Sequence, residues 1–331
     1  MKKIILTLIF GITLFTQDLS AEIIRRAAFD FGSGSIKMEI ADVDTEKQTI
    51  VQSHLSEAIL VPFNEDLLEN QTGYFSEKLL SKALEAGNRL KQLADQYDVK
   101  VLGGFATEAF RQARNSQDLF KTMEDLYGIS VRLVSQQEEG ELGFNTAVIL
   151  GQEDPYQVVV WDTGAGSAQL TTFIDDSIHV LKIPVGAITA AKLVISEIQG
   201  KTSTIESSPN PMTEQEAASG MVLIQERLPE LSPDWTMNLK EKAIIAIGAQ
   251  PKYVAKHGQI HTIEQVKEGL EKRLYKLDQQ LSSFPELECF RTGCFLLALS
   301  TMEKYNMKRV KYISASTGNT PAFLVNEKYW E

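Results

Sequence analysis

The sequence contains one short motif twice, and the residue types in it could bind phosphate. The motif, D-x-G-x-G-S, occupies residues 30–35 and again residues 162–167. Two glycines in a tight turn allow successive backbone N–H groups to face one anion. Each motif begins with an aspartate, Asp30 or Asp162, and a carboxylate beside a phosphate group requires a divalent cation between them. The two turns together therefore predict a clamp for one phosphate group, with Mg²⁺ or another divalent cation bound by the two aspartates.

The predicted phosphate-binding residues here are those inside the two turns and one nearby cation. They are Gly32, Ser33, Gly34, Ser35, Gly164, Ala165, Gly166, Ser167 and Lys37. Lys37 follows Ser35 by two positions, so both side chains lie on one face of a strand. In the alternative interpretation each motif is an ordinary hairpin turn, and Lys37 is a solvated surface residue.

The elements around the two motifs repeat in the same order. Each motif follows a short apolar run and precedes a stretch of period-two alternation, which is typical of a β-hairpin. The two aspartates lie 132 residues apart, and each half of the chain reads βββαβαβα. The sequence therefore predicts an α/β fold of two duplicated domains, residues 22–149 and 150–331, whose motifs face each other across a cleft. In one arrangement the last residues pack back onto the first domain.

Helix boundaries are predicted from capping residues and apolar spacing. In the first half, Ser76 caps one helix, a second runs from Ser116 to Gly128, and a third begins at about Gln137. The expected elements of the second half are a helix from Thr189, a helix from Thr213 with a Thr213/Glu216 capping box, a strand at 243–247, helices at 263–281 and 292–305, and a strand at 309–314. The polar segment 201–211 is expected to be a surface loop.

Composition and charge limit the classes of partner. The 331 residues include 33 Lys and Arg and 44 Asp and Glu, which gives a net charge of −11. This excess of negative charge argues against a protein that attracts nucleic acid or another long polyanion. Any anion must therefore be bound locally, by backbone N–H groups and a few cations. Beyond the N-terminus no stretch is apolar and long enough to predict a membrane span. The oligomeric state stays open, with a homodimer as one alternative.

The N-terminal residues have the layout of a secretory signal peptide. A basic start at residues 1–3 precedes an apolar run at residues 4–15, and small residues end at Ala21. Such a run is too short to span a bilayer, which takes about 20 residues. We therefore expect cleavage after Ala21 and a periplasmic or secreted protein, with a buried strand or an uncleaved anchor as alternatives. Cys289 and Cys294 are compatible with export and are expected to be buried thiols.

Three further segments resemble a known family. Residues 106–115 are similar to its A-T-x-x-x-R-x-A-x-N segment, residues 134–142 to I-S-G-x-E-E-A-R-L, and residues 183–187 to L-P-L-G-A. With the paired glycine motifs, they resemble the exopolyphosphatase/guanosine pentaphosphate phosphatase (Ppx/GppA) family of the actin-like ATPase superfamily. The resemblance implies two ribonuclease H-like domains and a Mg²⁺-dependent hydrolase that releases terminal phosphate from inorganic polyphosphate or another small phosphoanhydride. It also implies that Glu139 is the catalytic base and that Arg111 contacts phosphate. Arg111 offers a planar, permanently charged fork for phosphate oxygens, and in the alternative interpretation it is a solvated surface residue.

The sequence departs from the family pattern at several positions. Gln169 stands where the second glycine motif of the family has an acidic residue, Glu141 replaces an arginine, and two other family arginines are absent. These changes leave open a hydrolase of a short substrate or a polyphosphate-binding protein that has lost turnover. An actin-like kinase or ATPase is a third hypothesis, for which segment 248–251 is a poor adenosine-binding loop. Export favours polyphosphate over guanosine pentaphosphate, because the latter is a cytoplasmic compound.

Overall fold

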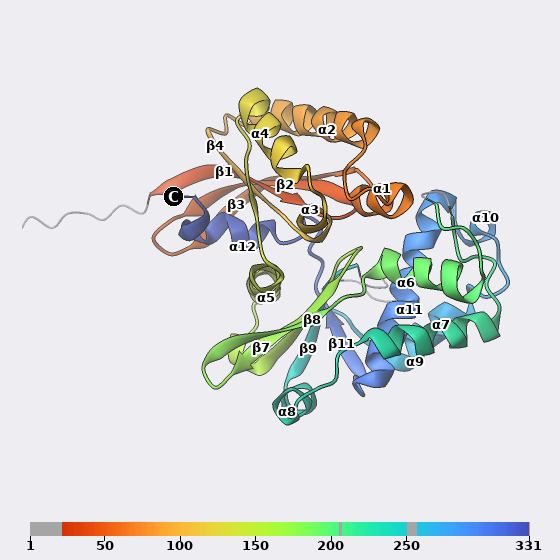
Figure 1. Cartoon of the computed structure of the whole chain (residues 1–331). Helices are drawn as coiled ribbons and strands as arrows, with labels where there is room; N and C mark the ends of the chain where they lie inside the picture. The colour runs from red at the N-terminus through yellow and green to blue at the C-terminus, as the bar shows by residue number, and fades with distance from the viewer. Residues whose placement is uncertain (1–21, 205–206, 250–256, 331) are drawn as a thin grey trace, which may run out of the picture.

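The described residues form two mixed β-sheets, each covered by helices (Figure 1). The computed structural model describes residues 22–204, 207–249 and 257–330. The first sheet has the order β3-β2-β1-β4-β5 and contains β1 (Ile23–Phe31), β2 (Ser35–Asp44), β3 (Thr49–Leu60), β4 (Val101–Ala106) and β5 (Ser130–Leu133). The second has the order β10-β11-β9-β6-β7-β8 and contains β6 (Val158–Thr163), β7 (Ala168–Ile174), β8 (Ser177–Ile183), β9 (Ala243–Gly248), β10 (Ile260–Thr262) and β11 (Arg309–Tyr312). Apart from β10 the two sheets share order and strand directions, which confirms the predicted duplicated α/β fold.

The central strand of each sheet is buried because side chains pack on both of its faces. Every residue of β6 is buried, and so are the last six residues of β1. Strands in this position are continuously apolar rather than alternating, which explains the apolar run before each glycine motif. By contrast, β3 lies at the sheet edge, and most of its residues are exposed or half-buried. Each motif therefore begins at the end of a rigid central strand and continues into a hairpin turn.

The helices of the first half are α1 (Phe63–Asn70), α2 (Glu77–Gln96), α3 (Glu108–Gln112), α4 (Ser116–Tyr127) and α5 (Gln136–Gly151). The predicted starts of α2, α4 and α5 agree with the structure to within one residue. Ser76 caps α2 through its side chain, and Gly128 ends α4 in the left-handed conformation. Ser135 and Glu138 form a capping box at the start of α5. This box fixes the first turn of α5, where Glu139 lies.

The helices of the second half are α6 (Ala187–Leu193), α7 (Glu214–Arg227), α8 (Pro233–Glu241), α9 (Ile263–Glu271), α10 (Asp278–Leu281), α11 (Glu288–Lys304) and α12 (Thr320–Val325). The prediction of one helix over 263–281 is wrong, because a turn separates α9 from α10. In that turn Tyr275 has a left-handed backbone (φ 62°) and its N–H donates to the Met212 carbonyl. Arg273, just before it, forms a buried ion pair with Glu288 of α11. These tertiary contacts stop a helix that local apolar spacing would continue, and α11 begins four residues before the predicted start.

The chain ends by returning to the first sheet. Although α12 follows the last strand of the second sheet, it packs against β1, β2, β3 and α5 (Figure 1). The buried guanidinium of Arg26 on β1 forms a two-pronged ion pair with Glu327, with both N···O distances 2.8 Å, and also donates to the Leu324 carbonyl. Helix α5 lies between the sheets and contacts β6, β7, β8 and β9. The two halves are therefore tied together by the segment that follows β11 and by α5.

Several expectations concern segments outside the sheets. Residues 1–21, which carry the predicted signal peptide, lie outside the described part of the chain. The described residues of segment 201–211 form neither helix nor strand, in agreement with the predicted loop. Cys289 and Cys294 both lie on α11 as thiols, the first half-buried and the second buried. Within the described ranges, no helix combines the length and the apolarity that crossing a membrane requires.

Candidate active site

The two glycine turns have the same geometry and face each other. In the first turn the Gly32 N–H donates to the Ser35 carbonyl with an N···O distance of 3.0 Å, and the equivalent bond closes the second turn at 2.8 Å. A Cβ placed on Gly166 of the second turn would lie 3.3 Å from Ser33 Oγ of the first. The backbones of the two turns therefore approach closely, and the structure brings together the two segments predicted to form the clamp.

Both turns line a cavity of about 610 Å³ between the two halves of the molecule. Twelve of the thirteen residues that the sequence predicts for the site line this cavity: Asp30, Gly32, Ser33, Gly34, Ser35, Lys37, Glu139, Asp162, Gly164, Ala165, Gly166 and Ser167. Arg111 is not among the lining residues. A cavity of this size between two units is typical of a small-molecule site, so the predicted residues converge on one place.

Asp30 and Asp162 are linked by a single residue, Asn319. The side-chain amide of Asn319 donates to Asp162 Oδ2 at 2.9 Å, and its backbone N–H donates to Asp30 Oδ2 at 3.3 Å. Both aspartates are buried. Burial raises the pKa of Asp162 to about 6, although the hydrogen bond from Asn319 opposes this. The two carboxylates therefore share a buried site whose negative charge is only partly compensated.

A buried glutamate of the first sheet fixes the loop that carries Asn319. Glu39 on β2 accepts hydrogen bonds at Oε2 from the hydroxyls of Thr317 and Thr320, both at 2.9 Å. Its other oxygen accepts from the Ser53 hydroxyl, also at 2.9 Å. Because the two threonines flank Asn319, these bonds set the position of its amide. The loop after β11 is thus anchored to the first sheet and reaches the aspartate of the second.

The same loop approaches Asp30 so closely that a side chain is excluded. Gly318 has a φ of +67°, and a Cβ placed on it would collide with Asp30 Oδ2. Glu39, Gly318 and Asn319 were not predicted as site residues from the sequence. The available signal was positional, because Asn319 follows a strand whose carboxyl end lies at the same sheet edge as that of β6.

Glu139 faces the cavity from the first turn of α5. Its side chain is buried, and burial raises its pKa to about 7, while Arg111 opposes this and the charges of Asp162 and Asp30 add to it. One turn further along the helix, a Cβ placed on Gly143 would lie 2.6 Å from Asp162 Oδ2, so α5 packs directly on that aspartate. A carboxylate whose pKa is near neutrality is suited to accept a proton from a reacting group.

The structure places Arg111 behind Glu139 instead of in the cavity wall. Its Nη2 donates to Glu139 Oε2 at 2.8 Å and to Glu108 Oε2 at 2.6 Å, and its Nη1 donates to the Val134 carbonyl at 2.9 Å. This arrangement does not support the direct contact with phosphate that was predicted for Arg111, because the guanidinium is engaged by protein oxygens. It indicates instead that Arg111 orients Glu139 and partly neutralises its charge.

Lys37 and Gln169 occupy equivalent positions in the two duplicated hairpins. Lys37 is paired with Asp30 across β1 and β2, and its Nζ lies 3.3 Å from Asp30 Oδ2. Gln169 is paired with Asp162 across β6 and β7 and is buried, with its amide 3.5 Å from Ser167 Oγ. One aspartate therefore faces a cation and the other faces a neutral amide. This difference agrees with the raised pKa of Asp162.

The donor chemistry of the two aspartates fits a hard divalent cation. Mg²⁺ is usually bound through one or two carboxylates, while water and phosphate oxygens complete its octahedral shell. Asp30 and Asp162 supply oxygen ligands of this kind at the wall of the cavity that contains both glycine turns. No group of three or more His, Cys, Asp or Glu side chains in the described residues is arranged to hold a metal ion. Any such ion would therefore need oxygen ligands from water or from the substrate.

The cavity is also lined by residues of α11 and of the end of β9. Gly248, with φ +76°, and Ala249 line it, and a Cβ placed on Gly248 would lie 2.8 Å from Asp162 Oδ1. The other two residues of segment 248–251, Gln250 and Pro251, lie outside the described residues. Phe290 and Cys289 of α11 line the same cavity. Burial raises the pKa of the Cys289 thiol to about 11. This thiol is therefore protonated at neutral pH and is a poor nucleophile.

Comparison with known proteins identifies the same fold in several solved structures. The sequence model described as the Ppx/GppA phosphatase family matches residues 40–230. A PPX-GPPA enzyme from Aquifex aeolicus has a TM-score of 0.69 at 18% identity, over 92% of this chain and 99% of that one. An exopolyphosphatase from Cytophaga hutchinsonii gives 0.71 at 13% identity over 91% and 97%, and an exopolyphosphatase-like protein gives 0.72 at 16% over 92% and 98%. These similarities confirm the predicted fold.

Proposed function

Because the chain belongs to the Ppx/GppA phosphatase family, as its motifs predict, we propose that it is a phosphoanhydride hydrolase that releases terminal phosphate from inorganic polyphosphate. One observation carries the proposal, namely that Glu139, Asp30 and Asp162 line the same cavity as both glycine turns. A base, cation ligands and phosphate-binding N–H groups are the components that phosphoryl transfer to water requires.

In this proposal Glu139 acts as the general base. Its ionised carboxylate accepts a proton from a water molecule while the water oxygen forms a bond to the terminal phosphorus. The bond from that phosphorus to the bridging oxygen breaks, and the shortened chain leaves with the electron pair as an anion. Arg111 directs the carboxylate from behind through its 2.8 Å hydrogen bond. The buried position of Glu139 keeps its pKa near 7, so that it is both ionised and basic at neutral pH.

The two glycine turns bind the phosphate group from opposite sides. Their N–H groups supply partial positive charge without long side chains, which suits a tight site in a chain of net charge −11. Lys37 adds a full charge beside Asp30. We infer that the turns hold the terminal phosphate in line with the water that Glu139 activates.

The proposed reaction uses a divalent cation, on which the family generally depends. Asp162 and Asp30 are the residues that would hold Mg²⁺, and the bound ion would neutralise negative charge on the phosphate. Asp162 has the stronger need for a cation, because Gln169 opposite it carries no charge. Asn319 positions Asp162 through its side-chain amide.

The charges of the lining favour a short substrate. In addition to Lys37, the cations among the described residues that line the cavity are Lys82, Lys192 and Arg291. Two of them are engaged by protein oxygens: Lys192 donates to the Ser207 carbonyl, and Arg291 pairs with Glu288. The described lining therefore offers few cations for phosphates beyond the first one or two. We propose a short polyphosphate or another small phosphoanhydride as substrate.

We also propose that the protein is exported. The proposal rests on the sequence of residues 1–21 alone, a basic start, an apolar run and a small-residue end. Cell fractionation with N-terminal sequencing of the purified protein tests it. A mature chain that begins at Glu22 in the periplasm or the medium is expected, and a full-length chain that begins at Met1 in the cytoplasm would contradict export.

The activity is tested by measuring phosphate release from polyphosphates of defined length with Mg²⁺. Glu139→Ala should lower the rate by at least about 100-fold while calorimetry shows retained binding of tripolyphosphate. Glu138→Gln is the matched control, because Glu138 is the neighbouring carboxylate but bonds to the Ser135 backbone instead of facing the cavity. Equal rates for the parent and Glu139→Ala would refute the assigned base. Tight binding without hydrolysis by the parent would identify a binding protein instead.

A further inference from the structure

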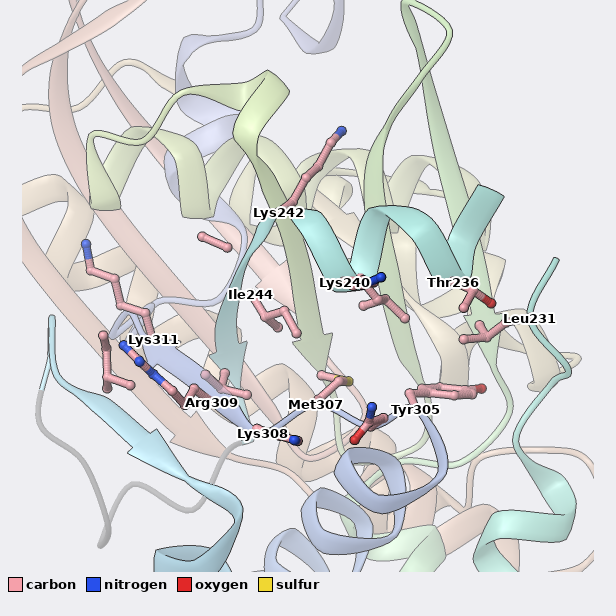
Figure 2. A pocket seen from close by; sticks show the side chains of 15 residues that line it. Leu231, Thr236, Lys240, Lys242, Ile244, Tyr305, Met307, Lys308, Arg309 and Lys311 are labelled. Atoms are coloured by element: carbon pink, nitrogen blue, oxygen red, sulfur yellow. The ribbon is translucent and has the colours of Figure 1, made fainter. Parts of the chain in front are cut away.

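A second cavity lies at the opposite ends of the strands of the second sheet from the proposed active site. Its volume is about 590 Å³, and it is formed by α8, the starts of β9 and β11 and the end of α11 (Figure 2). Strand β9 begins at this cavity with Ala243 and ends at the active-site cavity with Gly248. The two cavities are therefore separated by the length of one strand, about 17 Å. We refer to the second cavity as the basic groove.

The lining of the basic groove is rich in positive charge. Among the fifteen described residues that line it there are five Lys or Arg and no Asp or Glu. The five cations are Lys240, Lys242, Lys308, Arg309 and Lys311. This is the reverse of the whole chain, in which acidic residues outnumber basic ones by 44 to 33. The groove is therefore a local positive region on a protein of negative charge, and it attracts anions.

Two of these cations are engaged by the protein, and three are available. Lys242 donates to the Thr172 hydroxyl and the Phe173 carbonyl, and Lys311 pairs with Glu153. The remaining three form no ion pair with any described residue: Lys240, Lys308 and Arg309. Their side chains are exposed. The carboxylate of Glu264 attracts the charge of Lys308, but Glu264 is not one of the residues that line the groove. An anion in the groove would therefore meet cations that need not break existing ion pairs.

Between the cations the floor of the groove is apolar and largely aliphatic. Ile244, Met307 and Val310 are buried beneath it, and Figure 2 shows Ile244 and Met307 between Arg309 on one side and Tyr305 on the other. The Tyr305 hydroxyl donates to the Pro229 carbonyl, so it is already satisfied. At the rim Ile260 is 50% exposed. The apolar surface that stays accessible in the groove belongs to Ile260 and to the half-buried Leu231. An alkyl chain would cover these two side chains, whereas a free phosphate would leave them uncovered.

We propose that the basic groove binds a small amphipathic anion, with an aliphatic chain on the floor and one carboxylate or phosphate head group at Lys308 and Arg309. The cavity is large enough for such a ligand, since small-molecule sites usually measure about 300–1,000 Å³. Arg309 can pair with either head group through two parallel hydrogen bonds. The site is separate from the proposed active-site cavity, because none of the described residues lines both cavities.

The proposal is tested by calorimetry on the purified protein with decanoate and octyl phosphate, each at a concentration below that at which it forms micelles. One binding site is expected for each, with acetate and 1-octanol binding at least tenfold more weakly because each lacks one half of the ligand. Lys308→Glu with Arg309→Glu should weaken decanoate binding at least tenfold. A second variant, Ile260→Asp, places a carboxylate at the exposed rim and should have the same effect. The matched control is Lys78→Glu with Lys121→Glu, two exposed lysines of the first half, which should leave binding unchanged.

Several outcomes would overturn the proposal. Equal loss of binding in the control variant would show that only net charge matters. If tripolyphosphate displaces decanoate and this displacement depends on Lys308 and Arg309, the site recognises charge alone and not the alkyl chain. Binding to phosphatidylglycerol vesicles without binding to free decanoate would identify a membrane-contacting surface instead. Thermal unfolding and phosphate release, measured on each variant, separate loss of the groove from loss of the fold.

Discussion

Arg111 donates a hydrogen bond from Nη2 to Glu139 Oε2 over 2.8 Å. The arginine belongs to α3, a five-residue helix after β4, and the glutamate to the first turn of α5. The same guanidinium also bonds Glu108 and the Val134 carbonyl, so it lies between two carboxylates with its plane fixed. Burial raises the pKa of Glu139, and Arg111 is the principal opposing influence. The pair therefore sets the pH at which the proposed base becomes ionised.

Replacement of Arg111 should move the pH dependence of phosphate release. With a base of pKa about 7, the rate of the parent should fall as the pH drops below 7. Arg111→Gln removes the charge that favours ionised Glu139, so the acidic limb should move up by about one pH unit, which is about tenfold in rate at pH 6. Arg114→Gln is the control, because Arg114 stacks over Tyr74 and belongs to the same segment. An unchanged limb with a raised KM would instead support direct contact between Arg111 and phosphate.

Stability should show the cost of keeping Glu139 buried. Its pKa is about 7 in the folded chain against an ordinary 4.5, so between these values the native state binds a proton that the unfolded state has released. The contribution of Glu139 to stability therefore falls as the pH rises from about 4.5 to about 7, and the full cost is present above that. Glu139→Gln should raise the free energy of unfolding by about 1–3 kcal/mol at pH 8 and by much less at pH 5.

Glu138, the residue before Glu139, provides a control for which the expected change in the free energy of unfolding has the opposite sign. The pKa of Glu138 is lowered, first by the hydrogen bond from the Ser135 backbone, so its carboxylate stabilises the fold above its ordinary pKa. Glu138→Gln should therefore slightly destabilise the protein at pH 8. The free energy of unfolding of both variants is measured by urea titration at pH 5 and pH 8. A gain of stability for both variants, or for neither, would contradict the assignment of the raised pKa to Glu139.

The sequence predicted the parts of the site that have a local signature. The glycine turns were identified because a turn is encoded within a few residues, whereas Glu139 and Arg111 were assigned from segments that resemble a known family. Arg111 was predicted to contact phosphate, but its partner Glu139 lies 28 residues away, and spacing alone could not show that the guanidinium pairs with that carboxylate. Asn319 and Glu39 were missed because their roles exist only after the loop beyond β11 crosses to the first sheet.

The same distinction explains the fold. The order of strands followed from apolar runs and caps, which are local. The break between α9 and α10 depends on the contact of Tyr275 with Met212 and of Arg273 with Glu288, and these contacts join segments that are distant in sequence. By contrast, α8 begins with Ser232 as cap and Pro233 in the first turn. That local signal was present in the sequence, although no helix was predicted there.

Substitution at Gln169 should change the response to the divalent cation. Gln169 faces Asp162 across β6 and β7, at the position where the first hairpin has Lys37. Gln169→Glu adds a carboxylate beside Asp162, so the Mg²⁺ concentration for half-maximal activity should fall about three- to tenfold. Without Mg²⁺ the variant should be less stable than the parent, because a further buried charge has no partner. Gln169→Ala should leave the Mg²⁺ dependence of activity unchanged, and its loss of stability, which comes from the cavity it creates, should not depend on Mg²⁺. A loss of stability in Gln169→Glu that Mg²⁺ does not reverse would contradict the proposed cation site.

Glu39 should act as a positioning residue for the cation site although it does not line the cavity. Its two oxygens accept from Ser53, Thr317 and Thr320. Glu39→Ala leaves three hydroxyls without their acceptor, which should lower the free energy of unfolding by about 2–4 kcal/mol. It also frees the loop that holds Asn319 against Asp162, so the half-maximal Mg²⁺ concentration should rise and the rate at saturating Mg²⁺ should fall about tenfold. Glu39→Gln keeps the shape and two acceptor sites and should restore most of the stability and of the Mg²⁺ dependence.

Ser53→Ala separates the two effects of Glu39→Ala, because it removes a partner of Glu39 that lies outside the loop. Stability should fall, while the Mg²⁺ dependence stays that of the parent. If Glu39→Ala lowers the melting temperature but leaves the Mg²⁺ dependence unchanged at 15 °C below it, Glu39 supports the fold alone and the position of Asn319 is set by other contacts.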